Sequence, residues 1–126
     1  MRKKNMIRIM VFIMFFSLFF VVESKETYAY QVQYEQAKAN GTPSPFGHIV
    51  KSIGNSLPIY GDSYSSMDLK VDGVLIQRRY FDIDGKVDMD IDYTNHGNPA
   101  QHPVVPHRHN WTWPAIGGSP TRGPWY

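Results

Sequence analysis

The residues most able to do chemistry lie in one stretch of the chain, residues 78–111. Three alternating aspartates come first, and four of the chain's five histidines follow at once. These residues are Asp88, Asp90, Asp92, His96, His102, His107 and His109. Carboxylates and imidazoles gathered in this way can hold a divalent metal, and imidazoles can also act as acid and base near neutral pH.

The three aspartates alternate with apolar residues, which is typical of a half-buried β-strand whose successive side chains point to opposite faces. We expect Val87, Met89 and Ile91 to be buried and the aspartates to share the other face. Three like charges in a row repel, so they need solvent, an arginine on a neighbouring strand (Arg78 or Arg79), or a hard divalent cation. For a metal, the candidate ligands are Asp90, Asp92 and His102.

The histidines His107 and His109 project to the same side if their segment is extended. With His96 they are candidates for catalysis, because metal-free RNA cleavage needs one group to remove the 2′-hydroxyl proton and another to protonate the leaving oxygen. A cation must also hold the phosphate, for which we expect Arg79 and Arg108. The same imidazoles could instead bind a transition metal or hydrogen-bond within a loop.

A sheet must position these residues, and the sequence before them has the pattern for one. The candidate strands are residues 63–70, 74–80 and 86–93. Turns at Asp72-Gly73 and Asp84-Gly85 would join them into an antiparallel meander. Residues 94–126 hold six prolines, which cannot donate to a strand ladder. We therefore predict an α+β or mainly β fold, with a sheet of three or four antiparallel strands and an irregular, His/Pro-rich C-terminal wrap.

The chain starts with positive residues, an apolar run over residues 9–22 and a small residue, Ala29, which is the layout of a secretory signal peptide. We predict a signal-peptide helix over residues 1–29 and a secreted mature chain. A chain anchored in the membrane by an uncleaved segment is the alternative, although the run of 14 residues is shorter than the ~20 that span a bilayer.

Composition excludes several classes of site. After residue 29, eight Lys and Arg stand against nine Asp and Glu, a net charge of −1, so bulk positive charge cannot hold nucleic acid. The chain has no cysteine, which excludes disulfides, thiolate catalysis and zinc–cysteine sites.

The predicted organisation beyond the signal peptide has three parts. Residues 30–59 are an N-terminal arm and linker, with His48 on a surface loop. Residues 60–115 form the domain, and residues 116–126 form a loose tail. We expect a monomer with no stable transmembrane span after signal cleavage.

Several short motifs in the domain resemble those of a known family. They are residues 77–82, 84–85, 90–93, 95–99, 102–103 and 106–111. In order and spacing they are similar to motifs of the bacterial toxin 24 family, whose members lie at the C-termini of polymorphic toxins. The resemblance covers residues 60–115 and implies a nuclease, with RNA as substrate and an immunity protein as partner. Two features differ: this chain is short, and Asn110 stands where an aspartate is common in relatives.

Two functions are therefore open. The first is an exported ribonuclease-type toxin that uses the histidine and aspartate residues, with no cofactor or with a divalent metal. The second is a non-catalytic secreted module that binds a divalent metal or a cell-surface partner through the same face. An enzyme needs a cleft that joins the aspartate face to His107 and His109, whereas a binding module can leave them apart.

Overall fold

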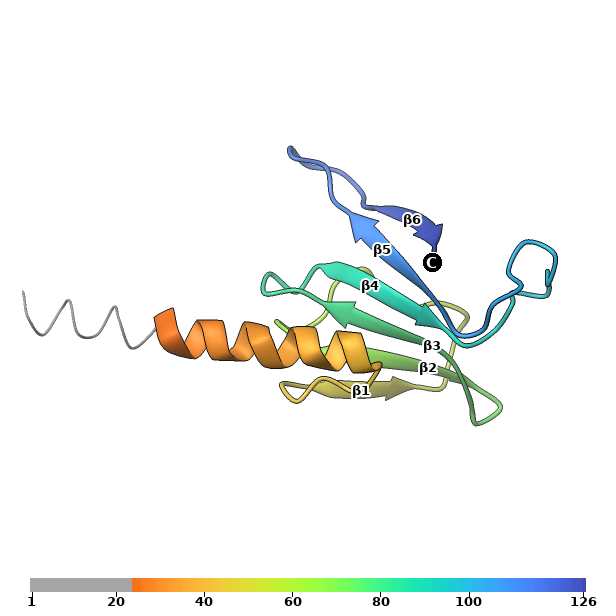
Figure 1. Cartoon of the computed structure of the whole chain (residues 1–126), viewed down its shortest axis with the longest axis horizontal. Helices are drawn as coiled ribbons and strands as arrows, with labels where there is room; N and C mark the ends of the chain where they lie inside the picture. The colour runs from red at the N-terminus through yellow and green to blue at the C-terminus, as the bar shows by residue number, and fades with distance from the viewer. Residues whose placement is uncertain (1–23) are drawn as a thin grey trace, which may run out of the picture. The chain divides into compact units, whose positions relative to one another are not determined.

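The computed structural model describes residues 24–126, so most of the predicted signal peptide, residues 1–23, lies outside the described residues (Figure 1). Residues 33–126 form one compact unit. Residues 24–40 are helical. In the described part of the chain, no helix is long and apolar enough to cross a membrane.

A single six-stranded sheet forms the body of residues 33–126, with its strands in chain order from β1 to β6 (Figure 1). The strands are β1 (His48–Lys51), β2 (Ser66–Val71), β3 (Val74–Phe81), β4 (Val87–Asp92), β5 (His107–Thr112) and β6 (Thr121–Trp125). β1 runs parallel to β2, and every other neighbouring pair is antiparallel. The predicted meander is therefore present as β2, β3 and β4, with bounds within a few residues of those expected.

The prediction of three or four antiparallel strands is wrong, because the sheet has six strands and is mixed. The His/Pro-rich segment, expected as an irregular wrap, contributes β5, and the segment expected as a loose tail contains β6. None of the prolines in these two segments lies in β5. Pro124 lies on the edge strand β6, where a missing N–H donor is tolerated.

The region predicted as an arm and linker contains β1, and its His48 is not a surface loop residue. His48 is half-buried, with Nδ1 2.8 Å from the Ser66 hydroxyl oxygen and Nε2 3.3 Å from an Asp68 carboxylate oxygen. Arg78 holds the same carboxylate with two hydrogen bonds, from Nε at 2.6 Å and from Nη2 at 2.8 Å. This network joins the edge strand β1 to β2 and β3.

Two glycine-containing turns fix the register of the meander. Asp72 and Gly73 both have positive φ, +50° and +78°, which fits the tight two-residue turn between β2 and β3. Gly85, in the turn between β3 and β4, has φ +70°, and a Cβ on it would lie 2.3 Å from the Gly61 carbonyl oxygen. Gly61 also donates its N–H to the Gly85 carbonyl at 2.9 Å, which keeps the two backbone segments this close, so only glycine fits at position 85.

The helix ends at Asn40, and the φ of +67° at Gly41 allows the two hydrogen bonds of a Schellman cap. Thr42 N–H donates to the Ala37 carbonyl and Gly41 N–H to the Lys38 carbonyl, at 3.0 and 3.2 Å. From β5, Arg108 donates to the Lys38 and Ala39 carbonyls at 2.7 and 3.0 Å. Arginine near the C-terminus of a helix satisfies carbonyls that have no partner within the helix.

The two faces of the sheet differ in chemistry. On one face Tyr80, Met89 and Ile91 pack with Tyr34 and Ala37 of the helix. Val87, Met89 and Ile91 are all buried, so that part of the prediction for β4 is confirmed.

The aspartates of β4 do not share one face. Asp90 and Asp92 project to the face opposite the helix, where both are fully buried. Asp88 instead contacts the Tyr34 hydroxyl at 2.9 Å and the Lys38 ammonium at 2.5 Å. The reason is a register shift between β3 and β4 that leaves Asp88 without a strand partner.

Candidate metal centre

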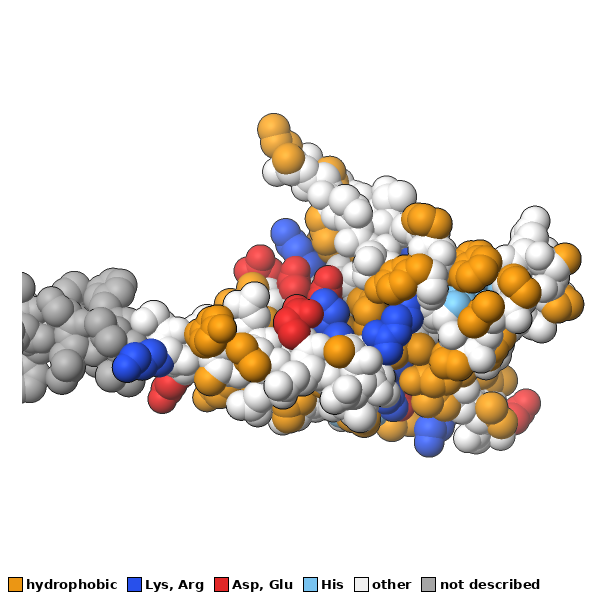
Figure 2. All heavy atoms as spheres, in the orientation of Figure 1, with side chains coloured by type: hydrophobic (Ala, Val, Ile, Leu, Met, Phe, Trp, Pro, Cys, Tyr) orange, Lys and Arg blue, Asp and Glu red, His pale blue; other side chains and the backbone are white. Residues whose placement is uncertain are grey.

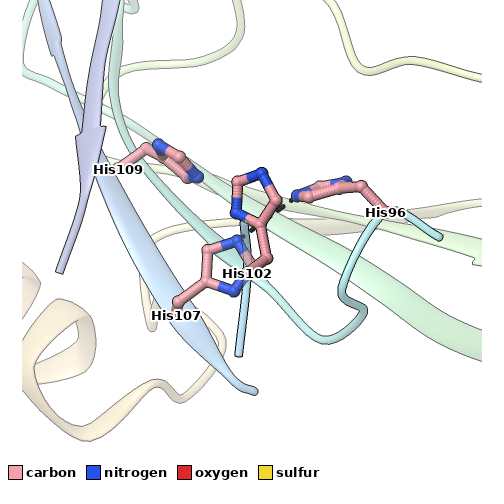
Figure 3. A group of neighbouring side chains, drawn as sticks. All are labelled: His96, His102, His107 and His109. Carbon is pink, nitrogen blue, oxygen red and sulfur yellow. Dashed lines mark hydrogen bonds between the residues drawn. The ribbon is translucent and has the colours of Figure 1, made fainter. Parts of the chain in front are cut away.

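Four imidazoles converge where β4 ends and β5 begins, on the face of the sheet away from the helix (Figure 3). They belong to His96, His102, His107 and His109, and one nitrogen of each lies within 4.8 Å of the others. The ring centroids of His96, His102 and His107 are 4.8, 5.0 and 5.3 Å apart. The fourth ring, His109, lies 5.2 Å from His107 and 6.4 Å from His102.

The backbone dictates this convergence. In β5 the side chains of His107 and His109 project to the same side, because strand side chains alternate. The ladder sets Asp92 opposite His107 and Asp90 opposite His109. His96 follows β4 in a turn with φ +54°, a backbone region that few non-glycine residues adopt. The sheet thus supplies two imidazoles and the loop between β4 and β5 supplies the other two.

Backbone carbonyls fix the orientation of the two strand histidines. His107 Nδ1 lies 2.8 Å from the Val104 carbonyl oxygen, and His109 Nδ1 lies 2.9 Å from that of Gly123. A carbonyl only accepts, so each Nδ1 carries a proton, and each Nε2 is the nitrogen left to face the cluster and to bind a metal. A metal-binding histidine is held in the same way by a hydrogen bond from its other nitrogen.

Asp92 contacts three of the imidazoles through one carboxylate oxygen. Its Oδ2 lies 3.0, 3.4 and 3.6 Å from the Nε2 atoms of His96, His109 and His107. Arg122 also donates to Oδ2, and Gln77 donates to Oδ1 at 2.7 Å. Burial alone would raise the pKa of Asp92, but the hydrogen bond from Gln77 and the charge of Arg122 outweigh it and lower the pKa. Asp92 is therefore a buried carboxylate in its charged form.

Two imidazole nitrogens of the cluster are buried with no hydrogen-bond partner: His109 Nε2 and His102 Nδ1. Burial lowers the pKa of both histidines, and the neighbouring imidazoles lower that of His102 further. In His109 the hydrogen bond to Gly123 opposes this effect without cancelling it. Both rings are thus neutral near pH 7, and an unpartnered buried lone pair is costly unless a cation or proton meets it.

Four ring separations and one nitrogen–nitrogen distance match those of a tetrahedral zinc site. With Zn–N bonds of about 2.0–2.1 Å, neighbouring ligand nitrogens lie about 3.3 Å apart and imidazole centroids about 5 Å apart. The Nε2 atoms of His96 and His107 are 3.3 Å apart, and four of the ring separations lie between 4.8 and 5.3 Å. The residues present therefore fit a divalent transition metal bound by three or four imidazoles, with the Asp92 carboxylate in contact with three of these rings.

Other residues predicted for the site lie outside the cluster. Asp90 is fully buried in a two-pronged ion pair with Arg79, at 2.7 and 2.8 Å, and accepts from the Trp111 indole N–H at 2.9 Å. Arg79 also donates to the Leu57 carbonyl at 2.7 Å. For Asp90, the partner is therefore an arginine on the neighbouring strand, one of the three alternatives that the sequence allowed for the aspartates.

Neither arginine predicted to hold phosphate stands beside the histidines. Arg79 is committed to Asp90, and Arg108 to the helix carbonyls. The arginine that does contact the cluster is Arg122 of β6, which was not predicted. The segment around Arg122 has no strand periodicity, so the sequence carries no signal for its role. Gln77 was not predicted as a site residue either, although it lies two positions from Arg79 in β3 and therefore on the same face.

No protein-family model matches this chain, and no curated protein or solved structure is detectably similar to it. The resemblance to the bacterial toxin 24 family therefore stays a prediction.

Proposed function

We propose that the chain binds one divalent transition-metal ion, with zinc the best fit, through His96, His102, His107 and His109. The observation that supports this proposal is the convergence of four imidazoles, two of them held with Nε2 toward the cluster and one of these Nε2 atoms, on His109, buried without a hydrogen-bond partner. Imidazole nitrogen is a preferred ligand of zinc, copper, nickel and iron, whereas magnesium and calcium prefer oxygen.

A second candidate is metal-dependent hydrolysis of RNA by an exported toxin-type domain. His96 favours it, because 38% of its side chain is exposed while His107 is fully buried, so one side of the cluster is open to solvent. A bound zinc ion could activate a water molecule there. The motif resemblance to toxin nucleases points the same way, and RNA and an immunity protein would then be the partners. Secretion through the predicted signal peptide belongs to this proposal too.

Metal binding is tested on the purified full-length chain, stripped with chelator and then dialysed against zinc. We expect one zinc per chain, measured by elemental analysis, and loss of binding in His107→Ala. The matched control is His48→Ala, which removes the one histidine outside the cluster and should bind zinc normally. Equal zinc uptake by all three proteins would show that the cluster is not the site.

RNA cleavage is tested by incubating total RNA with the zinc-loaded chain, the chain in chelator, and His96→Ala. A nuclease predicts cleavage that chelator abolishes and that His96→Ala lowers by about two orders of magnitude or more. If the folded, zinc-loaded chain cleaves no RNA, the second candidate is excluded and the metal-binding proposal stands.

A further inference from the structure

The charged residues around the cluster balance one another before any metal binds. Asp90 pairs with Arg79, and Asp92 pairs with Arg122, whose Nε also lies 3.3 Å from Asp90. Two carboxylates thus face two guanidinium groups, for a net charge of zero. Histidines bind a metal in the neutral form, so a divalent ion adds two positive charges that these groups do not neutralise.

An uncompensated charge in a largely buried site is expensive, so the loaded centre needs an anion. We infer that the metal-loaded cluster binds a small anionic ligand, with oxygen atoms that coordinate the metal and an apolar or aromatic body that lies against Trp125. The inference rests on the proposed metal site and adds the chemical class of its ligand.

The open side of the cluster has room for a ligand in its coordination. His96, His102 and His107 form a compact set, whereas His109 lies farther from His102. With all four histidines as ligands, a bound group would be the fifth ligand, a number that zinc can reach. His96, the most exposed of the histidines named here, stands at this side.

The surface beside the cluster is apolar. Trp125 pairs with His109 in the β5–β6 ladder, so both side chains project from one face of the sheet. The Trp125 ring lies 6.1 Å from His107 and 6.4 Å from His102, and the residue is 38% exposed. Val104, whose carbonyl orients His107, and its neighbour Val105 are exposed as well. Figure 2 shows histidine atoms at the surface with hydrophobic side chains around them.

This surface fits a small ligand better than a polynucleotide. A nucleic-acid strand brings one charge per phosphate and needs cations along its path. Arg79 and Arg108 are both engaged elsewhere, and Arg122 already contacts two carboxylates. An exposed tryptophan beside a metal instead suits one anionic head on a flat or apolar body, because aromatic rings add attraction through stacking.

The test uses the full-length chain loaded with cobalt(II), whose visible absorption reports coordination. Benzohydroxamate and acetohydroxamate carry the same metal-binding head on an aromatic and a methyl body. We expect both to change the spectrum, and benzohydroxamate to bind about three- to ten-fold more tightly. Trp125→Ala should bring the two affinities close together while cobalt uptake stays unchanged. Val105→Ser, at an exposed loop position, serves as a second variant and should also reduce the difference in affinity between the two hydroxamates.

Each outcome separates the inference from the proposed function. No cobalt spectrum at all would overturn the metal site and the ligand with it. A cobalt spectrum that neither hydroxamate changes would leave the metal site intact and overturn the ligand. Equal affinity for both hydroxamates in the wild-type chain, or tighter binding of a dinucleotide than of benzohydroxamate, would overturn the apolar body.

Discussion

Replacing Asp92 with asparagine tests the role given to this carboxylate at the centre of the histidine cluster. Asp92 is fully buried, accepts from Gln77 at Oδ1, and contacts Arg122 and three imidazoles at Oδ2. Asparagine has nearly the same shape but turns one acceptor into an N–H₂ donor. Whichever way the amide lies, its donor faces either the donating amide of Gln77 or the guanidinium of Arg122.

The size of the effect follows from these contacts. A buried donor without an acceptor costs about 1–3 kcal/mol. Loss of the charge opposite Arg122, whose side chain is 30% exposed and therefore screened by solvent, adds about 1 kcal/mol or less. We expect the free energy of unfolding of the metal-free chain to fall by about 1–4 kcal/mol. Zinc affinity should fall about 10- to 100-fold, as it does when residues that orient metal ligands are changed.

Urea denaturation in chelator measures the first effect, and a zinc titration with a competing chelator measures the second. Asp88→Asn is the matched control from the same strand, because Asp88 is 30% exposed and contacts Lys38 and Tyr34 instead of the histidines. It should lose about 1 kcal/mol or less and keep the zinc affinity of the wild type. Equal destabilisation by the two substitutions, or normal zinc affinity in Asp92→Asn, would refute the role given to Asp92.

Two further predictions concern stability. Because folding lowers the pKa of His102 and His109, the unfolded chain binds more protons below its imidazole pKa of about 6.5. The contribution of these histidines to the stability of the metal-free chain should therefore be complete above pH ~6.5 and be lost as the pH falls toward 5. Urea titrations across this pH range measure the free energy of unfolding, and a value that does not change with pH would contradict the prediction. Gly85→Ala should destabilise the chain by more than about 2 kcal/mol, because the added Cβ clashes with Gly61 in addition to the cost of positive φ. Gly73→Ala places its Cβ with no heavy atom within 4 Å, so it should lose only about 1–2 kcal/mol, the cost of positive φ. Thermal melts of the two variants measure this difference, and equal losses would exclude the clash.

The meander could be predicted from the sequence because its signals are local. Strict alternation marks β4, and Asp72-Gly73 marks the turn between β2 and β3. The cluster of histidines was also visible, because extended geometry places His107 and His109 on one side. These features depend on residues within a few positions of one another.

What could not be predicted depends on contacts between distant segments. β5 reads HRHNWT, without apolar alternation, because its inward face carries imidazoles in place of hydrocarbon. β6 has both a glycine and a proline, so its strand forms only because β5 provides a partner. Arg122 reaches Asp92 across β5, and Arg108 reaches the helix end some 70 residues earlier in the chain. Such roles have no sequence signal, because they depend on the fold that the other elements create.

The most direct test of the proposed metal centre is X-ray absorption at the zinc edge of the full-length, zinc-loaded chain. The proposal predicts four or five nitrogen and oxygen ligands at about 2.0–2.1 Å, with the outer-shell scattering of at least three imidazole rings. His107→Ala, examined in the same way, should lose the bound zinc. An outer shell without imidazole scattering would place the zinc elsewhere and contradict the proposal.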